Sequence, residues 1–225
     1  MNQEYCPPSL NYRHLRTALK NDPSIDLLSF VILRTPTDVL NVSLQEQSLI
    51  PLPVETLFSR ELQNFDLLVF DDFPFHVYVR SHHLERVREF VKGGGGLALI
   101  GGPNLLDGGR YAGTPLEEVL PVEAAAKGEY RREIPWKVRL TRAGAGHPVT
   151  RLEAGEKENG ILWGEMPPLD GINRLQPKAS AAVLLEGGEG VSHPVLSVGE
   201  YGRGRVLVLA TDYAWKWHMG MVALG

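Results

Sequence analysis

The first half of the chain alternates between apolar stripes at helical spacing and short apolar runs. Residues 10–19 carry the first stripe, and Ser9 stands at the position of an N-terminal cap. Residues 24–33, 65–72 and 96–102 are apolar runs of the kind that form buried parallel strands. We therefore expect helices to alternate with strands from residue 9 to residue 120, which predicts a mostly parallel sheet with helices on both faces.

Two further helices are marked by their ends. Residues 82–93 place Leu84, Val87, Phe90 and Val91 on the inward side, and glycines follow at the C-terminal end. Residues 114–120 begin with a threonine cap, a proline at the first helical position and a glutamate that completes a capping box. These signals predict where the helices between the strands begin and end.

Beyond residue 130 the pattern changes to strands joined by tight glycine turns. Gly187-Gly188 and Gly202-Arg203-Gly204 have the length of hairpin turns, which implies antiparallel pairing. We therefore expect one α/β domain, residues 1–225, whose C-terminal third adds antiparallel strands. The expected strands are residues 134–142, 180–187, 194–202 and 204–212.

The composition limits the function classes. Hydrophobic residues make up 43% and charged residues 22%, which is typical of a soluble globular protein, and the apolar runs are too short to span a bilayer. The net charge of -4 argues against nucleic-acid binding, because phosphates attract a basic face. Cys6 is the only cysteine, which excludes an internal disulfide. Residues 34–58 contain three prolines, and we expect this long connection to be functional or packed by its own side chains.

The stretch GGGGLALIGGPN raises the question of a phosphate loop or a nucleophile. Its first glycines precede the strand, and neither Gly-x-Gly-x-x-Gly nor Gly-Lys-Ser/Thr follows the strand, so a phosphate loop is not supported. The sharp turn after the strand is where a nucleophile elbow stands, but it contains no serine or cysteine. We expect its glycines to serve tight backbone geometry. The residues of this degenerate elbow are Ile100, Gly101, Gly102, Pro103 and Asn104.

A pair of carboxylates, Asp71 and Asp72, ends the preceding strand. Ligands bind at such strand ends in open α/β sheets. One interpretation is a metal site that also uses His76, His82 or His83, and the other is that Asp71 braces the next loop. Consecutive strand residues point to opposite faces, and consecutive helical residues do not face each other. These geometries favour the second interpretation and predict no metal.

Three later residues complete a candidate ligand edge. His147 precedes a proline in a loop, where it is either a base or a turn residue. Asp212 and Trp215 follow the last strand, and they join Asp71 and Asp72 if that strand is parallel to the one before the glycine turn. The aromatic residues there form either a ligand pocket or a packing surface.

Four segments together resemble a known family. They are FDLLVFDDF, FVKGGGGLALIGGPNLLDGGRYAGTPLEEVLPV, GHPVTRL and YGRGRVLVLATDYAWKWHMG. They are similar to the glutamine amidotransferase-like domain, of the class I superfamily, found in large bacterial membrane proteins that often carry von Willebrand factor A-like segments. The likeness covers most of residues 7–220 and implies a flavodoxin-like sheet. Such a domain opens with a strand before residue 7 and closes with a helix after residue 220, so we expect a piece excised from a longer chain.

The catalytic residues of active class I amidotransferases are missing. Their elbow cysteine would stand at about Ile100 or Gly101, and their later His-x-Glu pair is absent because His147 and His193 are each followed by Pro-Val. We therefore expect a non-catalytic module without a cofactor, tethered to the bacterial inner membrane by flanking segments. It would bind other domains of the same longer protein, a protein partner or a small ligand. The alternative is a hydrolase or amidotransferase that uses a non-cysteine nucleophile, or a metal at the strand ends.

Overall fold

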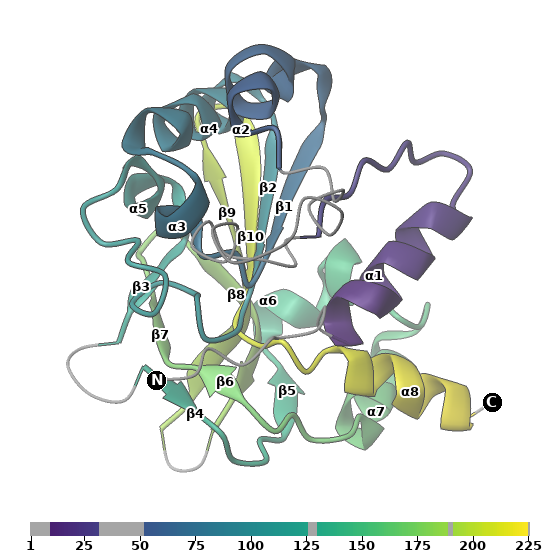
Figure 1. Cartoon of the computed structure of the whole chain (residues 1–225). Coiled ribbons are helices and arrows are strands. Elements are labelled where there is room, and N and C mark those ends of the chain that lie inside the picture. Colours follow the sequence, from purple (N-terminus) through teal and green to yellow (C-terminus); the bar gives the residue numbers. More distant parts are fainter. Residues whose placement is uncertain (1–9, 32–51, 126–129, 189–190, 225) are drawn as a thin grey trace, which may run out of the picture.

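A six-stranded sheet forms the centre of the molecule (Figure 1). The computed structural model describes residues 10–31, 52–125, 130–188 and 191–224. The strands of the sheet lie in the order β1-β2-β10-β9-β8-β5. Their bounds are β1 Leu67–Asp71, β2 Gly96–Ile100, β10 Gly204–Leu209, β9 His193–Tyr201, β8 Ala182–Gly187 and β5 Val138–Leu140.

The strand directions divide this sheet into two halves. β1, β2 and β10 pair in parallel, whereas β9, β8 and β5 are each antiparallel to the neighbour before them in the sheet order. β8 consequently points the same way as β10, so four of the six strands share one direction. This arrangement confirms the predicted α/β class, with a parallel half and C-terminal antiparallel strands.

Two small ribbons lie beside the main sheet. β3, Val122–Ala124, pairs with β7, Leu175–Pro177, and β4, Arg131–Arg132, pairs with β6, Ile172–Asn173. Both pairs are antiparallel. They are too short to carry a strand signal in the sequence, because two or three residues cannot display a period.

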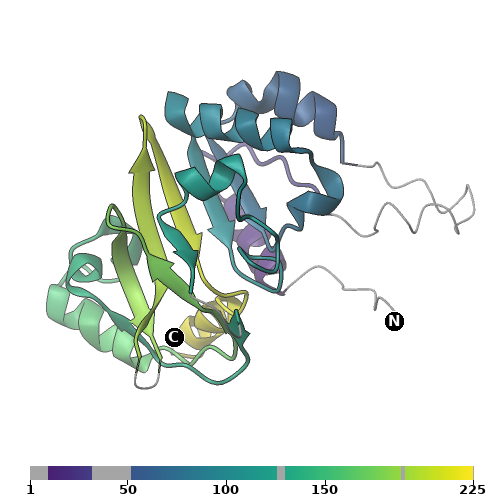
Figure 2. The same ribbon diagram turned by 90° about the vertical axis from the view of Figure 1, so that its left-hand side faces the viewer.

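α4 covers one face of the parallel half, and Figures 1 and 2 show α4 on one side of β1 and β2 and α1 on the other side. α4 buries Leu84, Val87 and Val91 and ends at Gly94, whose φ of 124° favours glycine. The helical elements are α1 Leu10–Asn21, α2 Val54–Thr56, η3 Leu57–Glu61, η4 Leu62–Asn64, α3 Phe75–Tyr78, α4 Ser81–Gly93, α5 Pro115–Val119, α6 Arg142–Ala145, η5 Pro148–Thr150, α7 Glu156–Glu165 and α8 Trp215–Leu224.

The strand predicted at residues 24–33 is wrong where the structure describes it. Residues 25–31 form no strand, and Ile25, Leu28 and Val31 are exposed by 39%, 57% and 39%. An apolar run shows that a segment prefers contact with other apolar groups, but it does not supply a strand to pair with. β1 is therefore the edge of the sheet. Three predicted features lie outside the described residues: the end of that run, the Ser9 cap and residues 34–51 of the irregular connection.

α8 begins at Trp215 and is the last helix that the structure describes. In the part of the chain that the structure describes, no helix has the length and apolar character needed to cross a membrane.

Candidate functional site

The residues that follow β1, β2 and β10 lie together at one corner of the molecule. β1, β2 and β10 are in register side by side, so Asp72, Gly101 and Ala210 follow their last residues at the same edge. The Asp72 N–H donates to the Ile100 carbonyl at 3.1 Å, and the Gly101 N–H donates to the Leu209 carbonyl at 2.7 Å. These bonds continue the sheet past the end of β2 and hold the glycine turn in place.

Asn173, at the end of β6, occupies the corner next to the glycine turn. Its side chain is 1% exposed, accepts from the Gly102 N–H at 3.0 Å and donates to the Gly102 carbonyl at 2.9 Å. Its backbone N–H donates to the Ala210 carbonyl at 2.8 Å. One buried amide thus bonds both backbone groups of Gly102, including its N–H, the kind of donor that an oxyanion hole needs free.

Gly101 and Gly102 have no room for a side chain. A Cβ atom at Gly101 would lie 2.4 Å from the Thr211 nitrogen and 2.7 Å from Asn173 Oδ1. At Gly102, where φ is 149°, it would lie 2.3 Å from the Asp72 carboxyl. Glycine is therefore required at both positions by the closeness of neighbouring atoms. The predicted role of these glycines, tight backbone geometry, agrees with this packing.

Asp72 closes the corner from the β1 side. Its φ of 45° lies in the left-handed region, and its carboxyl accepts from the Asn104 N–H at 2.7 Å and from Asn104 Nδ2 at 3.1 Å. Burial raises the pKa of Asp72 to about 6, and the nearby charges of Asp212 and Asp71 add to the rise, while the Asn104 hydrogen bonds oppose it. A strained, partly buried carboxyl with a raised pKa is the most distinctive chemical feature of this corner.

An ion-pair chain crosses the same corner. Arg131 of β4 donates to Asp212 at 2.7 Å and to Glu133 at 2.5 Å, and its side chain is 7% exposed. Arg131 and Asn173 face each other in the β4–β6 register. Sequence reasoning missed both, because neither belongs to a motif and Asn173 lies 71 positions from Gly102.

Two residues predicted for this edge, His147 and Trp215, belong to other elements. His147 Nδ1 accepts from the Val149 N–H at 3.2 Å and caps η5, so it acts as a turn residue. Trp215 begins α8 and is half-buried. Among the described residues, Asp71 and Asp72 join no histidine in a group of three metal-ligand side chains.

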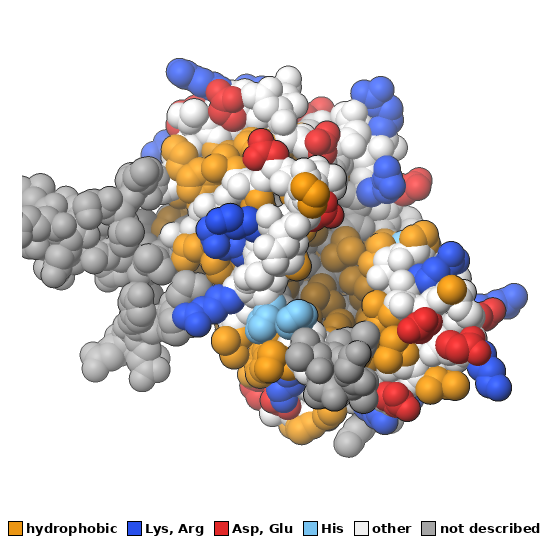
Figure 3. All heavy atoms as spheres, turned by 90° about the vertical axis from the view of Figure 1, so that its right-hand side faces the viewer, with side chains coloured by type: hydrophobic (Ala, Val, Ile, Leu, Met, Phe, Trp, Pro, Cys, Tyr) orange, Lys and Arg blue, Asp and Glu red, His pale blue; other side chains and the backbone are white. Residues whose placement is uncertain are grey.

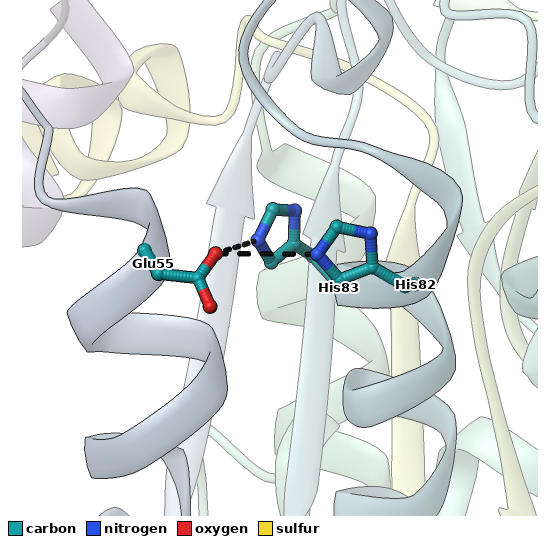
Figure 4. Close-up of side chains that lie close together, drawn as sticks. All are labelled: Glu55, His82 and His83. Carbon is teal, nitrogen blue, oxygen red and sulfur yellow. Dashed lines mark hydrogen bonds and ion pairs between the residues drawn. The ribbon is translucent and has the colours of Figure 1, made fainter.

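A separate cluster of ligand-type side chains lies at the start of α4 (Figure 4). Glu55 Oε2 lies 3.1 Å from His83 Nε2 and 4.0 Å from His82 Nε2, and the two rings are 3.9 Å apart between centroids. The expectation that these adjacent histidines cannot face one point is therefore wrong. In the first turn of a helix, rotation about the side-chain bonds compensates for the angle between consecutive residues.

The hydrogen bonds of His83 identify this cluster as a helix cap. The Arg80 N–H donates to His83 Nδ1 at 3.0 Å, so the proton of the neutral ring is on Nε2 and is donated to Glu55. A metal on Nε2 requires that proton on Nδ1, where it would oppose the Arg80 N–H. The bond from His83 also lowers the pKa of Glu55. The three residues do not fit a metal as they stand, because every polar atom of the buried ring is already used.

A comparison with protein families identifies the family of this chain. A family model described as "Putative glutamine amidotransferase" matches residues 61–222, which is more than half of the chain. The chain belongs to this glutamine amidotransferase-like family. The match covers the domain itself and does not extend to the membrane-protein setting, with von Willebrand factor A-like segments, that the resemblance implied.

Solved structures of similar fold include two cytoplasmic proteins of Salmonella. One, from Salmonella typhimurium LT2, is 26% identical, with 77% of this chain and 75% of the other covered and a TM-score of 0.57. The second, from Salmonella typhimurium, is 22% identical, with 79% and 76% covered and a TM-score of 0.55. A comparison with curated proteins found no match.

The turn after β2 leaves no open space at this corner, because the side chains of Asp72 and Asn173 fill the space around it. Its backbone N–H groups are already bonded. In this glutamine amidotransferase-like domain, the turn after β2 is therefore closed.

Proposed function

We propose that this glutamine amidotransferase-like domain is non-catalytic and binds another protein. The observation that carries the first part is the packing at Gly101, where the nearest atoms of Thr211 and Asn173 leave no room for any side chain. A cysteine thiolate needs both space and free oxyanion donors, and this turn offers neither. An attacking side chain therefore has no space at position 101, and position 100 carries an isoleucine, which cannot act as a nucleophile.

The open edge of the sheet supports the binding part of the proposal. Among the described residues no strand pairs with the outer side of β1, and Leu67 is 52% exposed there. The opposite edge, β5, is only three residues long and carries the charged, exposed Arg139, which discourages pairing. An apolar edge strand of five residues suits a partner segment that adds an extended strand.

Exposed apolar side chains favour a protein partner over a soluble small ligand. Ile25, Leu28 and Val31 are exposed along the unpaired segment that follows α1. Figure 3, which views the right-hand side of Figure 1, shows hydrophobic side chains gathered around a hollow on this face. Exposed apolar surface of this kind is typical of protein interaction sites. The partner is another domain of the same longer protein, and the family resemblance adds that this protein is associated with the bacterial inner membrane.

The binding proposal predicts slower amide hydrogen exchange in β1 when the partner is present. Residues 67–71 should exchange more slowly in the native gene product, isolated with its membranes, than in the chain of residues 1–225. Leu67→Lys should abolish the difference, because a charged edge opposes strand addition. Ile161→Lys, at an equally exposed position on α7, is the matched control and should leave it unchanged. Equal exchange in both preparations would refute binding at this edge.

A second candidate function rests on Asp72. A carboxyl with a pKa of about 6 suits a general acid or base, so a hydrolase that lacks a cysteine nucleophile would use this residue. Asp72 is, however, held by Asn104 and faces the closed turn. Its strained conformation is the specific observation that favours this alternative.

The non-catalytic proposal predicts no turnover of glutamine or of simple esters by the purified chain. Ammonia release and ester hydrolysis should equal those of an Asp72→Asn variant and of buffer alone, because no activated nucleophile is present. Activity that disappears in Asp72→Asn but persists in His147→Ala would establish the hydrolase instead. Glu55 contacts two histidines outside this corner. Glu55→Gln is therefore a control that should change neither ammonia release nor ester hydrolysis.

A further inference from the structure

The open edge of β1 presents a regular pattern of backbone groups. β1 is the outermost strand of the sheet, next to β2 (Figure 1). The Asp66 carbonyl accepts a hydrogen bond from β2 at 2.8 Å, and the Asp72 N–H donates one to β2 at 3.1 Å. Alternate residues of a strand direct their backbone groups to the same side. The even-numbered residues therefore bond to β2, and Leu67 and Val69 direct their N–H and carbonyl groups outward.

The side chains of this edge do not discourage pairing with another strand. Leu67, Leu68, Val69 and Phe70 are all apolar, and Leu67 is 52% exposed. Edge strands are commonly protected by lysine, by proline or by a bulge. These four residues include neither lysine nor proline, and the register between β1 and β2 is continuous. In the described part of the chain, no strand pairs with the outer side of β1.

A second copy of the chain offers a strand with the same pattern. Antiparallel pairing of a strand with its own copy creates a two-fold axis, about which every contact occurs twice. With the axis at Leu68, Leu67 of each copy lies opposite Val69 of the other. Residues that point toward each other in an antiparallel pair exchange both of their backbone hydrogen bonds. All outward groups of Leu67 and Val69 are bonded in this arrangement.

Charge opposes a shift of the axis toward the C-terminal end of β1. An axis at Val69 would place Asp66 of one copy directly opposite Asp72 of the other. Like charges that face each other across two strands destabilise a sheet. With the axis at Leu68, Asp66 lies opposite Phe70 instead, so no carboxylate of the strand faces another one.

Backbone bonding opposes a shift of the axis in the other direction. An axis at Leu67 would place Val69 opposite Phe65. The Phe65 N–H already donates to the Leu62 carbonyl at 3.3 Å, so this pair would lack one of its hydrogen bonds. The axis at Leu68 is therefore favoured over both of its neighbours.

We propose that the chain self-associates through β1, by antiparallel pairing of residues 67–69 with the same residues of a second copy. The two sheets then form one continuous sheet, and the exposed Leu67 of each copy packs beside Val69 of the other. Self-association goes beyond the proposed function, because it uses the same open edge but needs no other protein. The second copy and the partner protein would compete for this edge.

Analytical ultracentrifugation of the purified chain tests self-association. We expect the mass to rise with concentration from that of one chain, 24.9 kDa, to twice that value. Leu67→Glu should weaken the dimer about tenfold or more, because each dimer then carries two added charges at the paired edges. Ile161→Glu, which is equally exposed on α7, is the matched control and should leave the dimer unchanged.

Two outcomes of this measurement would overturn the proposal. One is a chain that stays monomeric up to about 1 mM. The other is a dimer that Leu67→Glu does not weaken, when circular dichroism shows the variant to be folded. A monomeric chain would leave β1 available to the partner of the proposed function, so the two proposals fail separately.

Single-cysteine variants test the position of the axis. In a Cys6→Ser background, Leu68→Cys places one thiol of each copy opposite the other at a non-hydrogen-bonded pair, where the Cα atoms of antiparallel strands lie within disulfide range. Oxidation should therefore link two copies of this variant. Val69→Cys, the matched control, places its thiol opposite Leu67 and should link far less. Equal linking of both variants, or no linking of Leu68→Cys, would refute pairing about Leu68.

Discussion

Replacing Gly101 with alanine should lower the free energy of unfolding by about 3 kcal/mol, the upper end of the usual range for overpacking. The added Cβ would lie 2.4 Å from the Thr211 nitrogen and 2.6 Å from the Ala210 carbonyl carbon. These are backbone atoms at the end of β10, so they cannot rotate away as a side chain would. The Gly101 N–H is also bonded to the Leu209 carbonyl, which fixes the turn from the other direction. Urea unfolding followed by circular dichroism measures the difference.

Gly146→Ala is the matched control for this substitution. Gly146 has nothing within 4 Å of the Cβ position and a φ of -100°, which alanine adopts readily. Its replacement should change stability by less than about 1 kcal/mol. If Gly101→Ala were equally harmless, the turn after β2 would have room for a side chain. The argument that this elbow is closed to a nucleophile would then fail.

The parallel half of the fold is predictable because its signals are local. β1, α4 and β2 each show their own apolar pattern, and Gly94 marks the end of α4. The hairpin of β9 and β10 is likewise predicted by its turn, where Gly202 has a φ of 61°. Each of these features depends on residues that are close together in the sequence.

The strand predicted at residues 24–33, which residues 25–31 do not form, shows the limit of local sequence signals. Its apolar run satisfies the pattern of a buried strand, but strand formation also needs a neighbour that supplies hydrogen bonds. Residues 25–31 have no such neighbour in the structure, and they remain exposed. Pairing between strands is decided by the whole fold, which a pattern along one segment does not contain.

The candidate site also contains residues that the sequence could place and residues that it could not. Asp72 and Asp212 could be placed at one edge because parallel neighbours end together, and their charges do interact. Arg131 and Asn173 could not be placed at this edge from the sequence, because they come from two-residue strands whose position depends on long-range contacts. The sequence therefore predicts the acidic members of the corner and omits the groups that neutralise Asp212 and close the turn.

Replacing Asp72 with asparagine should stabilise the protein at neutral pH and have little effect near pH 4. Burial raises the pKa of Asp72 from its ordinary value of 3.8 to about 6, so between these values the folded protein keeps a proton that the unfolded chain releases. Stability consequently falls as the pH rises through this interval, and the loss is complete above about pH 6. The shift corresponds to about 3 kcal/mol. Asparagine has no proton to lose and tolerates the left-handed conformation at a φ of 45°.

The measurement is the difference in unfolding free energy between the unaltered chain and Asp72→Asn, followed from pH 4 to pH 7.5. We expect the variant to gain up to about 3 kcal/mol across this range relative to the unaltered chain. The acceptor for the Asn104 N–H survives in the variant, whereas the contact of Asn104 Nδ2 with the second oxygen is lost, which subtracts a constant from the gain. Asp107→Asn, an exposed side chain on the same loop, is the control and should give a nearly constant difference. A constant difference for Asp72→Asn as well would mean that this carboxyl is solvated. Asp72 would then not close the corner at the end of β1.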